Sequence, residues 1–494
     1  HLDGASEFAG TIEDRRCRRH RHREQRCRFI GHDGGDAGAS NRFVAVAVPH
    51  RDVPHAHTGY IGDGVVAPGG ERAEGETQVA GPRAWAGAAG RRSGRHSMQS
   101  RVGRVTVLRM PVVWTDRHRG HAPEGGYWMG VRLAGDEEPE RGDVLRDQLL
   151  GAGATIVSAP DLGPDPVLAV HDAAFVDCLR RAHAEWVAAG HLSEPGQPHV
   201  VPYIFATPGF SARARPSRPP ASIRAEIGLY ATDTMTLISD GTYRAACAAV
   251  HASVHAADLV ADGLPAAYAA VRPPGHHAGP AYFGGSCYFN NAAASAQHLR
   301  ARGFASVAIV DIDAHQGNGT QEIFWSRGDV LYASVHVDPA AGWYPHFVGY
   351  ADEIGEGDGL GATLNLPLPP GTGDHEWLAA IEQLLRAAQQ RGSEALVVSL
   401  GVDAAADDPE SPLRVTAGGF RAAGALLGTL GLPTVFVQEG GYDLPRLGSL
   451  VLEVLHGFEE RLTTDIYPAD YGWTPDYEHP GRRIEWWYHN LGSV

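Results

Sequence analysis

The strongest constraint on the fold is a repeated alternation of short apolar segments with longer amphipathic segments between residues 241 and 441. The apolar segments have the length of strands buried on both faces, and they span 266–271, 306–313, 330–337, 395–403 and 433–441. The segments between them have helical spacing, and they span 241–263, 290–303, 376–392 and 416–431. Buried strands that alternate with helices are typical of a parallel sheet covered on both faces. The sequence therefore predicts an α/β fold, with one three-layer αβα domain around a central, mostly parallel sheet.

The two ends of the chain lack this pattern. Residues 1–100 show no sustained periodicity, and the first methionine is Met98. We expect residues 1–100 to be a disordered or non-native N-terminal extension, residues 105–462 to form the domain, and residues 463–494 to be a C-terminal tail. Early in the domain we expect one strand and two helices, at 110–114, 143–153 and 173–190.

The composition of the chain excludes several reaction mechanisms and classes of partner. All 42 basic residues are arginine, which excludes a lysine Schiff base, a Ser-Lys dyad and a lysine-bearing phosphate loop. The formal net charge of -16 argues against non-specific binding of nucleic acid. Five scattered cysteines form no disulfide framework, and no apolar run reaches the ~18 residues of a membrane span. We expect a cytoplasmic protein with neither nucleic acid nor a membrane as partner.

Titratable side chains follow four of the predicted strands. In an open parallel sheet, ligands bind outside the carboxyl ends of the strands. At those positions the chain carries "RPPGHH" (272–277), "DIDAH" (311–315), "GVD" (401–403) and "EGGY" (439–442). We therefore expect these groups to meet in one site at that edge of the sheet.

Three of these residues have the spacing of a metal site. Asp311, Asp313 and His315 are two apart, and in an extended chain such residues share a face. Asp313 and His315 could then hold one metal ion with Asp403 from a neighbouring strand. Two carboxylates and an imidazole, without cysteine, are typical of a catalytic zinc that keeps an open position for water. For Asp-x-Asp-x-His alone, the alternative is a solvated loop or a helix cap.

The adjacent residues His276 and His277 suit proton transfer. A metal-activated water needs a base to take its proton, and a leaving amine needs an acid. Two histidines can divide such roles when a carboxylate raises the pKa of one of them, and Asp311 and Asn318 are suitable unlike partners. Tyr442 follows two glycines, and its hydroxyl could donate to a developing oxyanion. The alternatives are two structural histidines and an ordinary core tyrosine.

Together these motifs resemble the histone deacetylase and acetylpolyamine amidohydrolase family, which has the arginase/deacetylase fold. The motifs "RPPGHHAG", "GGSCYFNN", "DIDAHQGNGTQ", "LGVDAAADDP" and "EGGY" occur in the family's order, and "PHFVGYADEIGEGDG" is closest to the acetylpolyamine and class II-like bacterial branch. The resemblance runs from about Met110 to about residue 460. It implies a zinc-dependent amidohydrolase that removes acetyl or other acyl groups from N-acetylated amines, of the acetylpolyamine or acetyl-lysine type, by metal-activated water.

The resemblance also implies a role for each site residue. One Zn²⁺ would be held by Asp313, His315 and Asp403. His277 would act as general base and then acid with Asn318 orienting it, His276 paired with Asp311 would act electrostatically, and Tyr442 would polarise the acetyl carbonyl. The substrate tunnel would be lined by Gly285, Ser286, Tyr344, Gly440 and Gly441. A structural K⁺ would lie near Asp311, Asp313, His315, Ser334 and Val335.

The chain departs from the family pattern at several positions. Gln316 stands where the family usually has histidine, and Ser286 replaces an aromatic wall residue, which would widen the tunnel. Arg224 and Met235 fall where polyamine-specific members carry acids, so the choice between polyamine and lysine substrates stays open. A homodimer is compatible with the resemblance. Two alternatives share the fold: a manganese ureohydrolase of the arginase or agmatinase type, which would need aspartate at Gly317, and a non-catalytic acyl-binding protein.

Overall fold

The centre of the described fold is one parallel sheet of eight strands. The computed structural model describes residues 107–193, 197–207 and 220–465, so the expected N-terminal extension and nearly all of the expected tail lie outside the described residues. The strand order is β4-β1-β5-β10-β9-β6-β7-β8, and every neighbouring pair is parallel. The strands are β1 (Val112–Trp114), β4 (Ile156–Ser158), β5 (Ala266–Ala269), β6 (Val307–Asp311), β7 (Val330–Val337), β8 (Thr363–Leu368), β9 (Ala395–Leu400) and β10 (Thr434–Gln438). The predicted α/β fold with a mostly parallel central sheet is confirmed.

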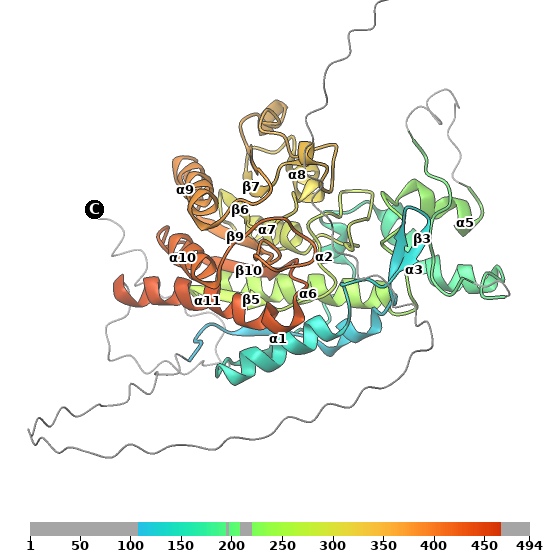
Figure 1. Cartoon of the computed structure of the whole chain (residues 1–494), viewed down its shortest axis with the longest axis horizontal. Coiled ribbons are helices and arrows are strands. Elements are labelled where there is room, and N and C mark those ends of the chain that lie inside the picture. The colour runs from blue at the N-terminus through green and yellow to red at the C-terminus, as the bar shows by residue number, and fades with distance from the viewer. Residues whose placement is uncertain (1–106, 194–196, 208–219, 466–494) are drawn as a thin grey trace, which may run out of the picture. The chain divides into compact units, whose positions relative to one another are not determined.

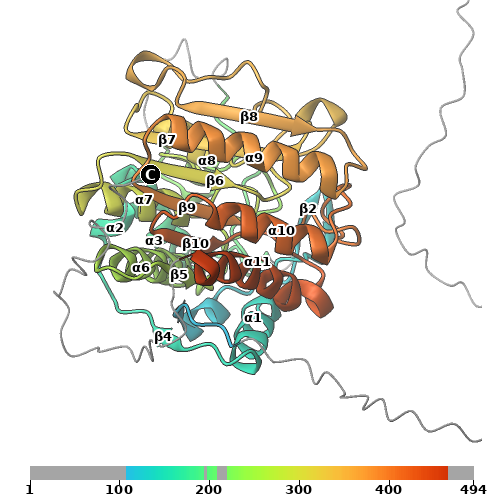
Figure 2. The same ribbon diagram turned by 90° about the vertical axis from the view of Figure 1, so that its left-hand side faces the viewer.

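Alternate residues of the strands enter two different apolar cores. On β6, Ala308 and Val310 belong to one core, whereas Val307 and Ile309 belong to the other. The first core is covered by α1 (Glu140–Gly151), α9 (Asp374–Gln390), α10 (Ala417–Gly428) and α11 (Leu444–Asp465). The second is covered by α6 (Thr242–Ala261), α7 (Asn291–Ala301) and α8 (Asn318–Phe324). Figure 1 labels these elements, and Figure 2 shows α9, α10 and α11 lying across one face of the sheet.

Smaller elements complete the described part of the chain. Helices α2 (Asp165–Leu168), α3 (Ala173–Ala188) and α5 (Ile223–Glu226) share a third apolar core with one face of α6. A separate antiparallel hairpin is formed by β2 (Gly126–Trp128) and β3 (Val131–Leu133). Single 3₁₀ turns are η1 (Asp116–Gly120), η2 (Ile227–Leu229), η3 (Pro339–Ala341) and η4 (Gly357–Gly359). Among the described helices, none combines the length and the apolar character that crossing a membrane requires.

The structure differs from the sequence-based expectation mainly at the ends of elements. Every expected strand and helix is present, but β6, β9 and β10 end two, three and three residues before the expected limits, at Asp311, Leu400 and Gln438. Within three residues of these strand ends lie Asp313, Asp403 and Glu439, and the side chain of each accepts a backbone N–H group from a loop. Strands β4 and β8 and helix α11 were not predicted, and α11 crosses the expected boundary at residue 462.

Candidate active site

Four adjacent strands bring the predicted site residues together. Strands β5, β10, β9 and β6 are consecutive in the sheet. The loops after them carry the histidine pair, Tyr442, Asp403 and the Asp313–His315 segment, respectively. Because the strands are parallel, these loops leave the sheet at the same edge.

Asp313, His315 and Asp403 form a compact, largely buried cluster. The Nδ1 atom of His315 lies 3.0 Å from Oδ2 of Asp403 and 3.2 Å from Oδ1 of Asp313. One ligand atom from each of the three residues lies within 4.8 Å of the others. Burial and the charge of Asp313 raise the pKa of Asp403, because two carboxylates here repel each other. This donor set, two carboxylates and one imidazole, fits a zinc ion, whose charge would relieve that repulsion.

The structure corrects one expectation. Asp311, Asp313 and His315 do not lie together on one face of an extended strand. Strand β6 ends at Asp311, and Asp313 turns the chain by accepting the backbone N–H of His315 at 2.8 Å. Asp311 contacts His276, whereas Asp313 and His315 meet Asp403. An aspartate whose side chain accepts the N–H group of the residue two positions later forms a local turn. Alternate residues therefore no longer share a face after Asp311.

Two glycines allow the chain to approach this cluster closely. A Cβ atom at Gly440 would lie 2.4 Å from Oδ2 of Asp403, and one at Gly401 would lie 2.0 Å from Oδ2 of Asp313. The N–H of Gly440 donates to Oδ2 of Asp313 at 2.7 Å. Any side chain at these positions would therefore displace the carboxylates.

The histidine pair has two unlike environments. Nδ1 of His276 lies 3.0 Å from Oδ2 of Asp311, whereas Nδ1 of His277 lies 2.8 Å from the side-chain oxygen of Asn318. Burial opposes protonation of His276, but the charges of Asp313 and Asp311 outweigh it and raise the pKa of His276 to about 10. Burial, together with the positive charge of His276, holds the pKa of His277 well below its ordinary value. At neutral pH the pair is therefore one imidazolium beside one neutral imidazole.

A buried ion-pair network behind the site was not identified from the sequence. Glu137 forms an ion pair with Arg272, whose Nε lies 2.6 Å from Oε1 and whose Nη2 donates to Oε2 at 3.0 Å. Oε1 of Glu137 also accepts from Nη1 of Arg141 at 3.2 Å. Arg141 also donates to the carbonyl oxygens of Gly441 (2.8 Å) and Glu439 (2.7 Å). Glu137 precedes α1 and Arg141 lies in its first turn, and charged residues so close in the sequence are usually exposed, so the sequence gave no sign of their burial.

This Glu137–Arg141–Arg272 network connects two loops of the site. Arg272 lies at the start of the loop that carries the histidine pair. Arg141 fixes the backbone on either side of Gly440, and its guanidinium lies 4.6 Å from the ring centroid of Tyr442. Burial, which outweighs the nearby Arg141 charge, raises the pKa of Tyr442 well above its ordinary value, so the phenol stays protonated.

The expected tunnel residues flank His277. The Tyr344 ring packs edge-on against the His277 ring, with centroids 4.7 Å apart. A Cβ atom at Gly285 would lie 2.4 Å from the His277 ring, and Ser286 has a positive φ of 64°. The same Cβ atom would lie 3.0 Å from the Tyr344 ring, so Gly285, His277 and Tyr344 are in mutual contact. Gly440 and Gly441 lie on the loop that Arg141 holds.

His171 fixes the loop that leaves the histidine pair. Its Nε2 atom accepts the backbone N–H of Asn290 at 2.8 Å, and its Nδ1–H donates to the carbonyl of Gly279 at 2.9 Å. These two bonds require the neutral ring. Burial accordingly lowers the pKa of His171 to about 4.

Comparison with known proteins agrees with this geometry. Residues 136–458 match the histone deacetylase domain. The chain is 40% identical over 349 residues to an acetylpolyamine amidohydrolase of Mycoplana ramosa, covering 70% of this chain and 99% of that protein. It is 39% identical over 352 residues to acetylpolyamine amidohydrolase 1 of Pseudomonas aeruginosa, covering 71% and 99%. The crystal structure of an acetylpolyamine aminohydrolase from Burkholderia pseudomallei superposes with a TM-score of 0.67 at 38% identity, covering 72% of this chain and 99% of that one.

Replacing Glu137 by glutamine should destabilise the protein strongly. Glu137→Gln leaves two buried guanidinium groups without their carboxylate, which costs about 3–5 kcal/mol of unfolding free energy. Urea denaturation measures the loss, and Glu140→Gln, an exposed position on α1, is the matched control. Equal stability of the two variants would show that the network contributes no more than a surface residue.

His171 should make stability depend on pH in the mildly acidic range. The folded state lowers the pKa from 6.5 to about 4, so His171 contributes fully above pH 6.5 and its contribution declines as the pH falls towards 4. Between pH 7 and pH 5 the stability difference between wild type and His171→Gln should shrink by about 2 kcal/mol. His375→Gln, at an exposed position, serves as the control. A difference that does not change with pH would contradict the neutral-ring assignment.

Proposed function

This chain belongs to the histone deacetylase family and is a hydrolase that deacetylates acetylated amines, and we propose that it does so with one zinc ion held by Asp313, His315 and Asp403. The observation that carries the proposal is the unlike histidine pair beside this donor cluster. His276 pairs with the carboxylate of Asp311 and His277 with the amide oxygen of Asn318, which are partners suited to an electrostatic residue and a neutral general base. Zinc bound there would supply a Lewis acid that activates water and polarises the acyl carbonyl.

The residues around the cluster divide the proton transfers. Asn318 accepts the Nδ1–H of His277, so only Nε2 can exchange protons with reactants. Nε2 takes the proton of the attacking water and later returns it to the departing amine nitrogen, which breaks the C–N bond and leaves a carboxylate and a free amine. The positive charge of His276 stabilises the negative charge that develops on the substrate during attack. The Tyr442 hydroxyl, which stays protonated, donates to the developing oxyanion.

We also propose a substrate class, a potassium site and the limits of the deacetylase domain. The relatives' names make acetylated polyamines the first substrates to test and acetyl-lysine peptides the second. We also propose a structural K⁺ near Asp311 and Ser334, which are partners on the neighbouring strands β6 and β7. The deacetylase domain is proposed to span residues 105–462, which contain the matched region.

Loss of the base should abolish turnover without loss of the fold. In zinc-loaded protein acting on an N-acetylated amine, His277→Ala should lower kcat by about 10²–10⁴. Tyr442→Phe should lower kcat by about 10²–10³ because one oxyanion donor is lost. His375→Ala is the control. Full activity of His277→Ala would rule out its role as base.

Metal content tests the ligand set independently of activity. Asp313→Ala and Asp403→Ala should lose the bound zinc that atomic emission detects in the wild type, because each removes a carboxylate from a site with few donors. Asp407→Asn, at an exposed carboxylate nearby in sequence, should keep it. Retention of a full zinc complement by both alanine variants would refute this ligand assignment.

A further inference from the structure

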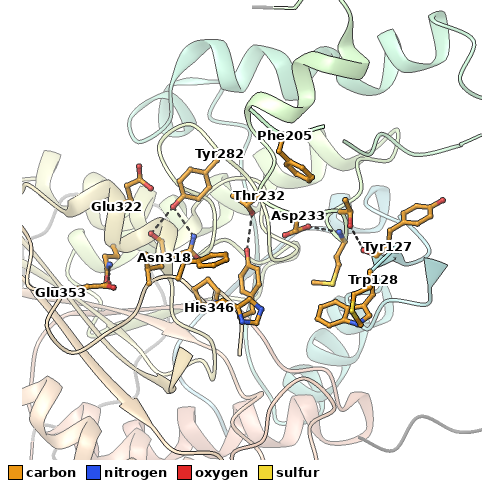
Figure 3. Close-up of a pocket in the computed structure, with 18 of the residues that line it drawn as sticks. Tyr127, Trp128, Phe205, Thr232, Asp233, Tyr282, Asn318, Glu322, His346 and Glu353 are labelled. Carbon is orange, nitrogen blue, oxygen red and sulfur yellow. Dashed lines mark hydrogen bonds between the residues drawn. The ribbon is translucent and has the colours of Figure 1, made fainter. Parts of the chain in front are cut away.

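A groove of about 830 Å³ lies next to the proposed active site (Figure 3). It is continuous with that site, because Asn318 and Tyr344 line it and both contact His277. One end is formed by the β2–β3 hairpin at Tyr127 and Trp128, and the other by residues of α8, including Glu322. A molecule bound at His277 can therefore extend into the groove.

The lining of the groove is mainly apolar. Seven Phe, Tyr and Trp residues contribute to it, namely Tyr127, Trp128, Phe205, Tyr282, Trp325, Tyr344 and Phe347. Exposed apolar side chains lie on its rim: Phe347 is 86% exposed and Met129 is 84% exposed. Large apolar side chains that gather around a concave site and remain in water are typical of a surface that receives an apolar ligand.

Two of the three carboxylates in the lining are already used by the protein. Asp233 accepts the N–H groups of Met235 (2.9 Å) and Thr236 (2.8 Å) with Oδ1, and the N–H of Gly285 (2.6 Å) with Oδ2. Glu353 accepts from the Gln321 side chain (2.6 Å) and the Gly349 N–H (2.9 Å) through Oε2. These carboxylates hold loops in place. The third, Glu322, is exposed and lies at the end away from the hairpin.

Met235 occupies the hairpin end of the groove. Its loop is fixed to β2, because the N–H of Tyr127 donates to the Thr234 carbonyl at 3.1 Å and Thr234 Oγ1 donates to the Tyr127 carbonyl at 2.7 Å. A Cβ atom at Gly126 would lie 2.6 Å from the carbonyl oxygen of Met235, so strand and loop are in close contact. The backbone therefore holds Met235 at this end of the groove, which Tyr127 and Trp128 also line.

We propose that this groove receives the amine half of the substrate and selects an uncharged, apolar or aromatic amine over a polyamine. The inference rests on the proposed deacetylase function and specifies its substrate class. An ammonium group placed beside Met235 and Trp128 would lose its hydration without gaining a free carboxylate as partner. A methyl group placed there has no such desolvation penalty, and its removal from water is favourable. Met235 is therefore the residue that determines the preference.

A matched pair of amides tests the selection. N-hexylacetamide and N-acetylcadaverine have the same length and shape, but the first ends in a methyl group and the second in an ammonium group. For zinc-loaded wild type, kcat/KM should be higher for N-hexylacetamide by about tenfold or more. Met235→Glu should reverse the preference, while Met235→Gln, of similar size and without charge, should not.

Several results would overturn the inference. They are a wild-type preference for N-acetylcadaverine, an unchanged ratio in Met235→Glu, or a selective loss of N-acetylcadaverine turnover in Glu322→Gln. A dimer by sedimentation velocity that Phe347→Asp dissociates without changing the ratio would show that a second copy covers the groove, and would also overturn it.

Failure of the proposed function would appear differently. Zinc-loaded protein would then hydrolyse neither amide nor an acetyl-lysine peptide. The selection would remain measurable, because tryptophan fluorescence gives the dissociation constants of both amides without turnover. Tighter binding of N-hexylacetamide by about tenfold is expected, and equal or weaker binding would refute the selection.

Discussion

The buried contact of Glu137 with two arginines determines how the site is assembled. Arg272 begins the loop of the histidine pair, and Arg141 binds the carbonyl groups on either side of Gly440. Neither loop has regular secondary structure, so its position depends on such side chain–backbone bonds. A guanidinium presents several donors in a fixed plane, which lets one arginine hold two carbonyls and a carboxylate together. The apolar cores place the strand ends, and this network places the loops that follow them.

Charge balance then gives each histidine its state. Asp311, Asp313 and Asp403 are all buried, and buried carboxylates favour a positive charge on the imidazoles that touch them. His276 touches such a carboxylate and becomes charged, while His277 touches an amide and stays neutral beside that charge. The charges of Asp313 and Asp311 raise the pKa of His276, whereas burial and the charge of His276 lower that of His277, so two adjacent, identical side chains differ in protonation.

The fold and part of the site could be predicted from the sequence, because they depend on strand order and on local residue spacing. The fold and the meeting of His276, Asp313 and Asp403 follow from buried strands whose carboxyl ends share an edge. The sequence did not predict Glu137, because its partner Arg272 is 135 residues away and a charged residue just before a helix gives no sign of burial. The groove was missed for the same reason, since its lining comes from segments far apart in the chain. The turn after Asp311 was missed because side-chain acceptance of a backbone N–H overrides strand periodicity.

One side chain separates the two compartments of the site. Tyr344 packs against His277 on one side and lines the groove on the other. Its loop is attached at both ends, through the Trp343 indole to His315 and through Gly349 to Glu353. Under the proposed function, the general base and the groove for the amine therefore share a common wall, and a change to that wall alters both. Divergence towards a new amine and adjustment of the base are mechanically linked in this scaffold.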